Sequence, residues 1–396
     1  MKTVTLREAW LKIKDSKQYV IVGAGPAGRK VLAYFGKYDL RPICYFDNNG
    51  QLSGELVDGI LVKKPCMLDE DTLYFICVRK EEVKTVLYEQ LLSLGINEES
   101  IFVVRSCMPN YSYEYLSNMP EERYQEELDL IYLESFGRFI DWEHPKTYNE
   151  IINWEKLNVR DPRRTKYADK YQVREWIQEQ IGEEYLVKYL GVWDRAEEID
   201  FSVLPNQFVL KLNNGSSRNI VVKDKSIINE EEIRTQLDEW MNKNFAFVSY
   251  EMHYKDIPPK IICEEYLEGL ADVYYDYNVF CFHGEPKYIW CINGSHKEDC
   301  KASFYDLNWE KQPFYYGYPM DEELAPKPEK LDEMLDLCRI LAKDFEHVRV
   351  DWYEYPNCEK GILFGEMTFS TWGGIVRIEP EEYDKLLGEL IKDKRS

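Results

Sequence analysis

The sequence lacks the patterns that hold a structural metal or a disulfide framework. Its ten cysteines are scattered from Cys44 to Cys358 without a C-x-x-C pair, which argues against a zinc ribbon and against dense disulfides. A Gly-x-Ser-x-Gly nucleophile motif is also missing. The five histidines show no metal-ligand spacing; they are His144, His253, His283, His296 and His347. We therefore expect reduced thiols in a cytoplasm.

Long apolar runs are missing too, and basic residues are outnumbered. No stretch of about 18 apolar residues occurs, and the N-terminus MKTVTLREAWLKIKDSKQY is broken by charge, so it has no signal-peptide core. The 72 acidic and 50 basic residues give a formal net charge of −22, which repels phosphate backbones and anionic lipids. The sequence thus predicts a cytoplasmic protein with no nucleic acid partner and no membrane insertion.

The 396 residues, 44% of them hydrophobic, can bury two or three cores. Between about residues 18 and 107, short β-rich runs alternate with helical stretches, a rhythm typical of a parallel sheet. A polar, aromatic, helix-favouring region follows. We predict an α/β (α+β) chain with a Rossmann-like parallel-sheet domain at 1–110, a helical connector at 111–160 and a second α/β domain at 161–396.

Periodicity and composition predict individual elements. Strands are expected at Tyr19–Val22, Pro42–Phe46, Leu73–Val78, Ile101–Val104, Phe208–Leu212, Asn219–Val222, Lys260–Tyr266, Tyr277–Phe282, Lys287–Asn293, Val348–Tyr353 and Gly361–Thr368. Helices are expected at Ala27–Phe35, Lys166–Gln180, Glu230–Asn242, Lys330–Asp344 and Pro380–Lys392.

A glycine loop follows the first predicted strand. Gly23, Gly25 and Gly28 lead into a helix, and Asp47 ends the next strand. This order suits a nucleotide, because glycines let the backbone approach a diphosphate, the helix N-terminus offers free N–H groups and the acid accepts from a ribose hydroxyl. The alternative is a relic of a nucleotide fold that only supports the rest of the chain. The stretch from Val20 through CYFDNNGQLSGELVDGILVKKP resembles the N-terminal domains of sugar acyltransferases, which implies nucleotide-sugar binding.

Cations and a flexible turn form a second pattern. Lys211 lies on a predicted strand that ends at a turn of small residues, Gly215, Ser216 and Ser217. A strand lysine beside such a flap can hold a polyphosphate from one side while backbone amides cover the other. Lys170, in a predicted helix, offers a second cation, although a lone lysine there is more often a solvated surface charge.

Acidic residues on predicted strands form the last part of this pattern. Asp351 and Glu366 lie on consecutive predicted strands, so a hairpin can bring both carboxylates to one face, where they would suit Mg²⁺ bound to ATP phosphates. Arg349 shares the face of Asp351 by strand alternation, and a simple ion pair with that acid is the alternative. Glu264 ends another strand, where a carboxylate can reach an adenine edge or a ribose, although acids at strand ends are usually plain surface.

These residues carry a resemblance to the ATP-grasp superfamily, to which D-alanine:D-alanine ligases belong. From about Gly137 to Leu390 the chain is similar, more specifically, to the ATP-grasp family typified by teichuronopeptide biosynthesis proteins, among bacterial surface-polysaccharide and capsule enzymes. The matching phrases are HPKTYNEIINWEKLNVRDP, YADKYQVREWI, LPNQFVLKLNNGS, EEYLEG, FYDLNWE, VRVDWY and FGEMTF. The resemblance implies an ATP-grasp fold after the Rossmann-like domain.

The resemblance also implies roles for single residues. Lys170 and Lys211 would hold phosphates, Arg349 would steady an acyl phosphate or oxyanion, and Asp276 would lie near ribose. Gly215, Ser216 and Ser217 would form the flap; Glu264, Tyr266 and Leu267 would bind near adenine; Asp351, Glu366 and Thr368 would form the metal site.

Three positions depart from the family pattern. Asn278 and Asn214 replace a lysine and a flap histidine, and Thr368 replaces the last metal-site asparagine. The loop Ser370 to Gly374, which includes Trp372, is an atypical wall for the acceptor pocket.

The resemblance implies an ATP- and Mg²⁺-dependent ligase that forms an amide between a small-molecule carboxylate, such as a uronic acid in a nucleotide-sugar, and an amine. An ATP-grasp sugar kinase and a non-catalytic nucleotide-binding module are the alternatives. The oligomeric state stays open, with a homodimer as one option.

Overall fold

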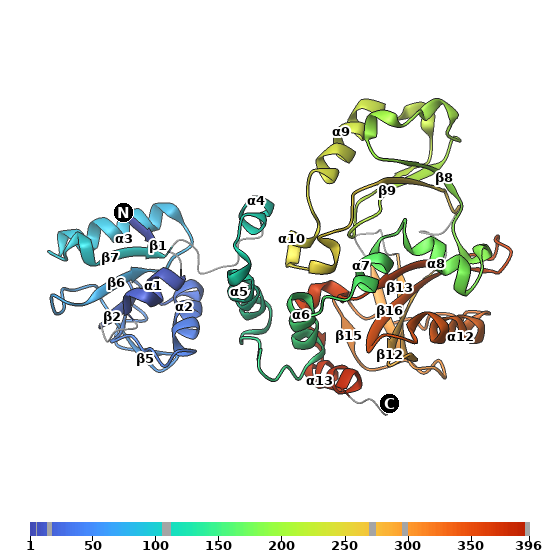
Figure 1. The fold of residues 1–396 in the computed structure, drawn as a ribbon. Coiled ribbons are helices and arrows are strands. Elements are labelled where there is room, and N and C mark those ends of the chain that lie inside the picture. Colours follow the sequence, from blue (N-terminus) through green and yellow to red (C-terminus); the bar gives the residue numbers. More distant parts are fainter. Residues whose placement is uncertain (5, 14–17, 105–111, 269–274, 295–299, 393–396) are drawn as a thin grey trace. The chain divides into compact units, whose positions relative to one another are not determined.

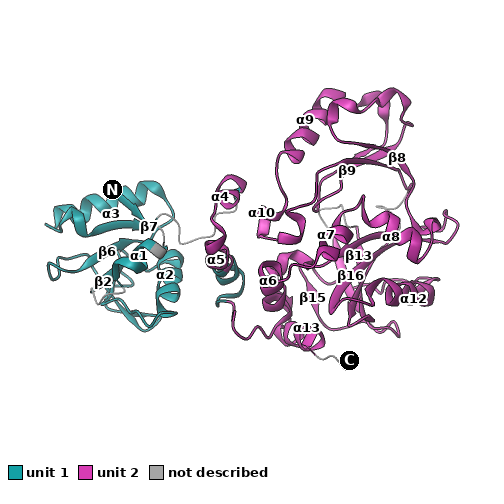
Figure 2. Cartoon of the chain, in the orientation of Figure 1, with its two compact units in different colours: residues 1–112, 129–139 teal, residues 113–128, 140–396 magenta. Residues whose placement is uncertain are grey.

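The computed structural model describes residues 1–4, 6–13, 18–104, 112–268, 275–294 and 300–392. The chain divides into two compact units, shown in different colours in Figure 2. Unit 1 contains residues 1–112 and 129–139, and unit 2 contains residues 113–128 and 140–396. Each unit is described by itself below.

Unit 1 is built on a seven-stranded sheet. Its strand order is β1 (Lys2–Val4), β7 (Ile101–Val104), β6 (Leu73–Ile76), β2 (Tyr19–Val22), β3 (Tyr45–Phe46), β5 (Ile60–Lys63) and β4 (Leu56–Val57). Neighbouring strands are parallel except for the β4–β5 hairpin. The helices are α1 (Leu6–Ile13), α2 (Pro26–Gly36) and α3 (Glu81–Ser93) (Figure 1).

Two apolar clusters place these helices on opposite faces of the sheet. Ile21 and Phe75 pack with Val31 of α2 and Ala9 of α1 in one cluster. The alternate strand residues pack with Leu87, Tyr88 and Leu91 of α3 in the other. The central strands are buried on both faces, which explains their continuous apolar sequences. The predicted α/β class, with a parallel N-terminal sheet, is confirmed.

Helices dominate the stretch that follows. They are α4 (Tyr113–Ser117), α5 (Tyr124–Phe136) and α6 (Tyr148–Asn158). Helix α6 begins with a capping box, in which the Thr147 side chain accepts from the Glu150 N–H and the Glu150 carboxylate accepts from the Thr147 N–H. Its buried residues Tyr148, Ile151 and Ile152 belong to the apolar core of unit 2.

The first sheet of unit 2 is antiparallel and has four strands. Its order is β10 (Asn219–Val222), β9 (Phe208–Leu212), β11 (Ile261–Glu265) and β8 (Tyr189–Trp193). Phe208, Leu210 and Leu212 point to one face, where they pack with Ile233 and Leu237 of α9 (Glu230–Met241). Alternation sends Val209 and Lys211 to the opposite face.

The second sheet is also antiparallel. Its order is β14 (Lys301–Tyr305), β13 (Glu285–Asn293), β12 (Tyr275–Phe282), β16 (His347–Glu354) and β17 (Ile362–Thr368). Helix α12 (Leu331–Ala342) packs on one face. The other face is apolar in one part and polar in another. Phe280, Trp290 and Phe304 pack in a core with α6 and α13 (Glu381–Lys392). Asp276 and Asp351 lie on the same face, farther along strands β12 and β16. One sheet face therefore serves both a core and a polar site.

The remaining elements are short. They are α7 (Pro162–Ala168), α8 (Val173–Gln180), α10 (Ala246–Ser249), the pair β15 (Tyr315–Tyr316) and β18 (Ile378–Glu379), and the 3-10 turns η1 (Glu98–Ser100), η2 (Glu121–Arg123), η3 (Glu183–Tyr185), η4 (Ala196–Glu198), η5 (Phe201–Val203), η6 (Lys225–Ile227), η7 (Met252–Tyr254) and η8 (Thr371–Gly374). Within the described part of the chain, no helix is long and apolar enough to cross a membrane.

Most predicted elements lie within a few residues of observed ones, with one correction. The helix predicted over Lys166–Gln180 is two helices, α7 and α8, separated by a turn at residues 169–172. The carboxylate of Asp169 accepts hydrogen bonds from the N–H groups of Tyr171 and Gln172 and so replaces the helical carbonyl partners. Lys170 therefore lies in a turn, not in a helix.

Candidate active site

The lysine predicted on a strand is paired with the acid of the neighbouring strand. Lys211 of β9 and Glu264 of β11 point away from the α9 core, and Lys211 Nζ lies 2.5 Å from Glu264 Oε2. Both side chains are largely but not completely buried. Strand alternation thus delivers a cation and an anion together to the free face of the first sheet.

Lys170 connects the glycine loop to the second sheet. Its Nζ donates to the Gly215 carbonyl at 2.8 Å and lies 2.8 Å from Glu366 Oε2 on β17. The turn that carries it is fixed at its base, since Asn213 donates its side-chain amide to Asp169 and accepts the Lys170 N–H at its carbonyl. A lysine held this way is not a freely solvated surface charge.

The predicted flap lies between β9 and β10. Gly215 has φ +80°, and a Cβ added there would lie 2.3 Å from the Phe245 ring, so only glycine fits without rearrangement. Ser217 is also left-handed, at φ +58°. Ser216 and Ser217 are exposed, whereas Gly215 is buried against Phe245. The loop therefore has a fixed base and an accessible tip.

The β16–β17 hairpin brings the two predicted metal acids together. Arg349 donates from Nε and Nη2 to the two carboxylate oxygens of Asp351, both at 2.7 Å. Thr368 Oγ1 lies 3.4 Å from Asp351 Oδ2 and 3.3 Å from Glu366 Oε1, so its hydroxyl can donate to either acid. Arg349 Nη2 is 3.8 Å from Glu366. The ion pair between Arg349 and Asp351 is thus present, within a larger cluster.

Burial and neighbouring cations act differently on the two acids. Burial raises the pKa of Asp351 to about 6, although the Arg349 guanidinium acts in the opposite direction. Burial would also raise the pKa of Glu366, but Lys170, Arg349 and Lys211 together hold that pKa below its usual value. Glu366 therefore stays ionised, and Lys211 is close enough to influence it.

This pair suits Mg²⁺, which proteins usually hold by one or two carboxylates together with substrate phosphate oxygens. Asp351, Glu366 and the Thr368 hydroxyl supply oxygen ligands at one point, beside lysines that can bind phosphate. Among the described residues, no group of three or more His, Cys, Asp and Glu side chains could hold a metal ion. Together with substrate phosphate oxygens, Asp351 and Glu366 would complete the ligand set that Mg²⁺ usually takes.

Two of the adenine and ribose candidates, Glu264 and Asp276, are linked to this cluster by their charges. Asp276, at the start of β12, is opposite Tyr353 of β16 and is one of the charges acting on the pKa of Asp351. Tyr266 and Leu267 follow β11 directly and are half-buried. They follow Glu264 by two and three positions in the chain.

Two tyrosines of the cluster were not predicted. Burial raises the pKa of Tyr353 well above its usual value, and the acids Asp276, Glu366, Glu264 and Asp351 raise it further. A single phenol is thus surrounded by the predicted acids from both sheets, and its position two residues after Asp351 was the available signal. Burial also raises the pKa of Tyr254 in η7, and Glu251, Glu366 and Asp351 raise it further. Nothing in the sequence around Tyr254 indicated that it lies near these acids.

Behind the cluster, buried side chains hold the loop Ser370 to Gly374. Lys156 Nζ donates to the carbonyls of Ser249 (2.8 Å) and Gly373 (2.6 Å), and burial lowers its pKa to about 7. Asn153 donates to Gly374 O at 2.7 Å, and Tyr316 donates to Thr371 O at 2.8 Å. On its other side the loop reaches the cluster, because Arg349 Nη1 donates to Thr371 Oγ1 at 3.4 Å.

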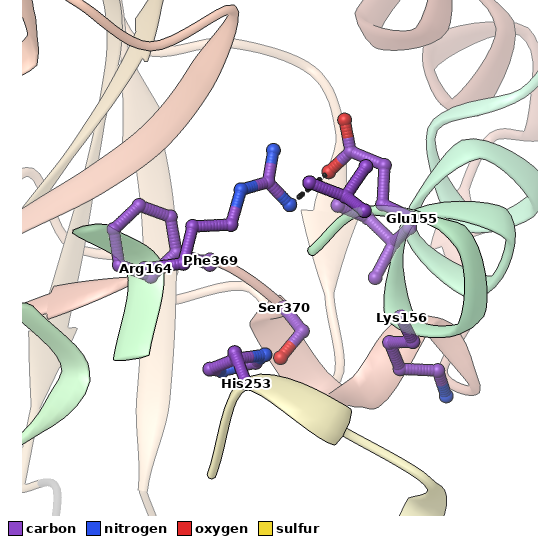
Figure 3. A pocket seen from close by; sticks show the side chains of 8 residues that line it. Glu155, Lys156, Arg164, His253, Phe369 and Ser370 are labelled. Carbon is purple, nitrogen blue, oxygen red and sulfur yellow. Dashed lines mark hydrogen bonds and ion pairs between the residues drawn. The ribbon is translucent and has the colours of Figure 1, made fainter. Parts of the chain in front are cut away.

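A small polar pocket adjoins this loop (Figure 3). Its lining residues are Ile152, Glu155, Lys156, Val159, Arg164, His253, Phe369 and Ser370. Arg164 pairs with Glu155 at 2.8 Å, the dashed contact in Figure 3. The Nε2 atom of His253 is buried and has no hydrogen-bond partner, and burial lowers the His253 pKa to about 3. The ring is therefore neutral at ordinary pH.

The glycine-loop candidates belong to unit 1. Gly23 has φ +111°, and a Cβ at Gly28 would lie 1.8 Å from the Gly23 carbonyl oxygen, so both are required by the tight turn. A Cβ at Gly25, the N-cap of α2, would meet nothing within 4 Å, so space is open there. Asp47 accepts the Ala24 N–H at 2.8 Å and so holds the loop itself. These four residues are brought together within unit 1.

Comparisons with known proteins agree with the geometry of unit 2. Residues 150–392 match the family model described as TupA-like ATPgrasp. A search of curated proteins found no match. Among solved structures, the chain is similar to an L-amino acid ligase from Bacillus licheniformis (12% identity, 95% of this chain and 75% of that chain covered, TM-score 0.36).

Two further solved structures are similar at the same level. They are a D-alanine–D-alanine ligase from Bacillus anthracis complexed with ATP (10% identity, 89% and 86% covered, TM-score 0.31) and the ATP-grasp ligase PsnB complexed with minimal precursor, Mg and ADP (12% identity, 96% and 97% covered, TM-score 0.34). Identities and scores this low say nothing about substrate.

Proposed function

Because the chain belongs to the TupA-like ATP-grasp family, we propose that it joins a carboxylate to an amine at the expense of ATP. Membership confirms the predictions of an ATP-grasp enzyme and of ATP with Mg²⁺ as its cofactors. The finer proposal concerns substrate: a uronic acid or related carboxylate, coupled to an amine during surface-polysaccharide synthesis.

One observation carries the proposal. Three cations from a turn and two different sheets, Lys170, Lys211 and Arg349, all act on the Glu366 carboxylate, and Asp351 pairs with Arg349 beside it. Such a convergence of phosphate-binding cations with metal-binding acids suits the transfer of a γ-phosphoryl group, which needs positioning and charge neutralisation.

The reaction is written as two balanced steps. A carboxylate oxygen attacks the γ-phosphorus of ATP, ADP leaves and an acyl phosphate forms; the amine then attacks the acyl carbon, phosphate leaves and a proton is released. Lys170 and Lys211 would bind the phosphates, and Asp351, Glu366 and Thr368 would hold Mg²⁺, which when bound would neutralise phosphate charge. Arg349, anchored by Asp351, presents its guanidinium to the acyl phosphate oxygens.

Unit 1 is proposed to hold the nucleotide part of a nucleotide-sugar. Support comes from the open space at Gly25, the turn formed by Gly23 and Gly28, and the free N–H groups at the start of α2. We also place the protein in a reducing cytoplasm, in line with the nine free cysteines that the structure describes.

The test is ATP consumption with Mg²⁺ against a panel of nucleotide-linked uronic acids, with and without amines, with phosphate products identified by ³¹P NMR. Amine-dependent release of ADP and phosphate together with a new amide is the expected result. A phosphorylated sugar with ADP would establish the kinase instead, and tight ATP binding without turnover would leave a binding module.

A further inference from the structure

The loop that follows β17 holds a tryptophan in an unusual backbone conformation. Trp372 has φ 50° and ψ 24°, and Gly373 beside it has φ 57°. The left-handed region is unfavourable for a bulky L-residue, at a cost of about 1–3 kcal/mol. The indole is nevertheless 39% exposed, so its own burial does not explain the conformation.

The conformation is imposed by the loop backbone. The carbonyls of Thr371, Gly373 and Gly374 accept hydrogen bonds from Tyr316, Lys156 and Asn153, which are buried. None of these contacts involves the Trp372 side chain. The loop is thus anchored from behind while it presents an aromatic ring.

The indole ring of Trp372 is oriented by contacts with the backbone of a glycine and with a second aromatic ring. A Cβ at Gly317 would lie 2.8 Å from Trp372 Nε1, so the indole edge rests directly on that glycine. Trp372 meets Tyr318 edge to face, with centroids 5.4 Å apart. Tyr318 in turn stacks on the buried Trp290 at 5.8 Å, and the Arg349 guanidinium lies 5.8 Å from the Trp290 ring. The aromatic side chains therefore run from an exposed ring to the proposed acyl-phosphate site.

We propose that Trp372 and Tyr318 form a subsite that stacks the pyranose ring of a carboxylate-bearing sugar, with its carboxylate directed to Arg349. The proposal rests on the proposed function and specifies its substrate class. The face of an indole carries partial negative charge and attracts the C–H face of a sugar ring. A ring fixed by its backbone loses little conformational freedom when it binds.

Arg349 has one N–H group that can still donate to such a carboxylate. Four of its five N–H groups donate to Asp351, Thr368 and Thr371. Among the described residues, the second Nη1 hydrogen has no acceptor. An oxygen of the substrate carboxylate can accept it, so that stacking on Trp372 and pairing with Arg349 orient one molecule from two sides.

The test is saturation-transfer NMR with free glucuronate and galacturonate, and with an acyclic hydroxycarboxylate for comparison. It measures binding and needs no turnover. In the wild-type protein the ring protons of the uronates should receive saturation. Trp372→Gly, which suits the left-handed backbone and therefore retains the fold, should weaken uronate binding by about 10- to 100-fold. Trp372→Phe should retain most of the binding, and binding of the acyclic acid and of ATP should be unchanged.

Failure of this subsite can be separated from failure of the proposed function. Equal uronate binding by the wild type and Trp372→Gly, or no uronate binding by the wild type, overturns the subsite even where amide product forms. Trp372-dependent ring binding without amide product leaves the subsite in place and overturns the ligase. Equal weakening of the acyclic acid would also count against stacking.

Discussion

At the scale of single residues, the site is a set of charges that depend on one another. Arg349 is fixed by Asp351, Lys170 by Glu366 and Lys211 by Glu264. Each pair unites a group proposed to meet phosphate with a carboxylate, so removing one member leaves a buried or half-buried partner uncompensated. Substitutions should therefore preserve size and polarity.

Asp351→Asn and Glu366→Gln should each lower ATP turnover at least about 100-fold, because each removes a carboxylate proposed to hold Mg²⁺. Turnover is measured by ADP release, and circular dichroism checks the fold. Glu359→Gln, an exposed acid in the turn of the same hairpin, is the matched control and should retain full turnover. Nearly normal turnover in both acid variants would remove the metal assignment.

Several of these residues could be found from sequence, and some could not. Strand alternation was enough to group Arg349 with Asp351, and the hairpin turn was enough to group Asp351 with Glu366. Tyr254 could not be found, since only the packing of η7 brings it to the acids. The role of the buried Lys156 could not be predicted either, because its two carbonyl acceptors, Ser249 and Gly373, lie far from it in sequence.

At the scale of elements, the glycine loop between β9 and β10 should be sensitive to a single methyl group. Gly215→Ala must adopt φ +80° against the Phe245 ring, which would displace the carbonyl that Lys170 binds. We expect an ATP KM raised about 3- to 10-fold and a loss of about 1–2 kcal/mol in unfolding free energy.

Gly50→Ala is the control for that substitution, because an added Cβ there meets nothing within 4 Å and no left-handed backbone is required. Steady-state kinetics and urea denaturation give the two readouts. An unchanged ATP KM in Gly215→Ala would mean that the loop does not contact the nucleotide.

Long strands with strong apolar patterns were predictable, and weak edge strands were not. Strands β8 and β14 lie at sheet edges, and their sequences YLGVW and KASFY include glycine and small residues that disfavour strands. The β4–β5 hairpin was also missed, although its Asp58-Gly59 turn, with φ +50° and +76°, carries a recognised hairpin signal. The break after α7 depends on a side-chain contact of Asp169 that periodicity does not report.

At the scale of the whole molecule, the two units should bind their ligands through different residues. Asp47→Ala removes the carboxylate that accepts the Ala24 N–H and is proposed to meet a ribose. We expect weaker nucleotide-sugar binding, by about 10-fold, and an unchanged ATP KM. Isothermal titration with a nucleotide-linked uronic acid measures the first and kinetics the second. A changed ATP KM would contradict separate sites, and unchanged nucleotide-sugar affinity would remove Asp47 from the proposal.

Global stability should fall in mild acid because two histidines are buried. Burial, reinforced by nearby arginines, lowers the pKa values of His253 and His347 to about 3. Below pH 6.5 these histidines become protonated in the unfolded chain but stay neutral in the folded protein. Each histidine therefore lowers the free energy of unfolding by about 1.4 kcal/mol per pH unit as the pH falls from about 6.5 to 3.

Urea denaturation at pH 7.5, 6.5 and 5.5 measures this dependence. His347→Gln should flatten the loss of stability with falling pH, whereas His144→Gln, an exposed site, should leave it as in the wild type. Comparing slopes separates titration from any constant cost of the substitution. Identical slopes in all three proteins would contradict the assignment.

The way the loop Ser370 to Gly374 is anchored also bears on evolvability. Its supports grip main-chain carbonyls of Thr371, Gly373 and Gly374, and these carbonyls remain whatever side chain position 372 bears. Mutation at that position can therefore exchange one recognition surface for another while the scaffold and the phosphate-transfer residues stay in place. A change in the proposed sugar specificity would therefore need only a single substitution, at position 372.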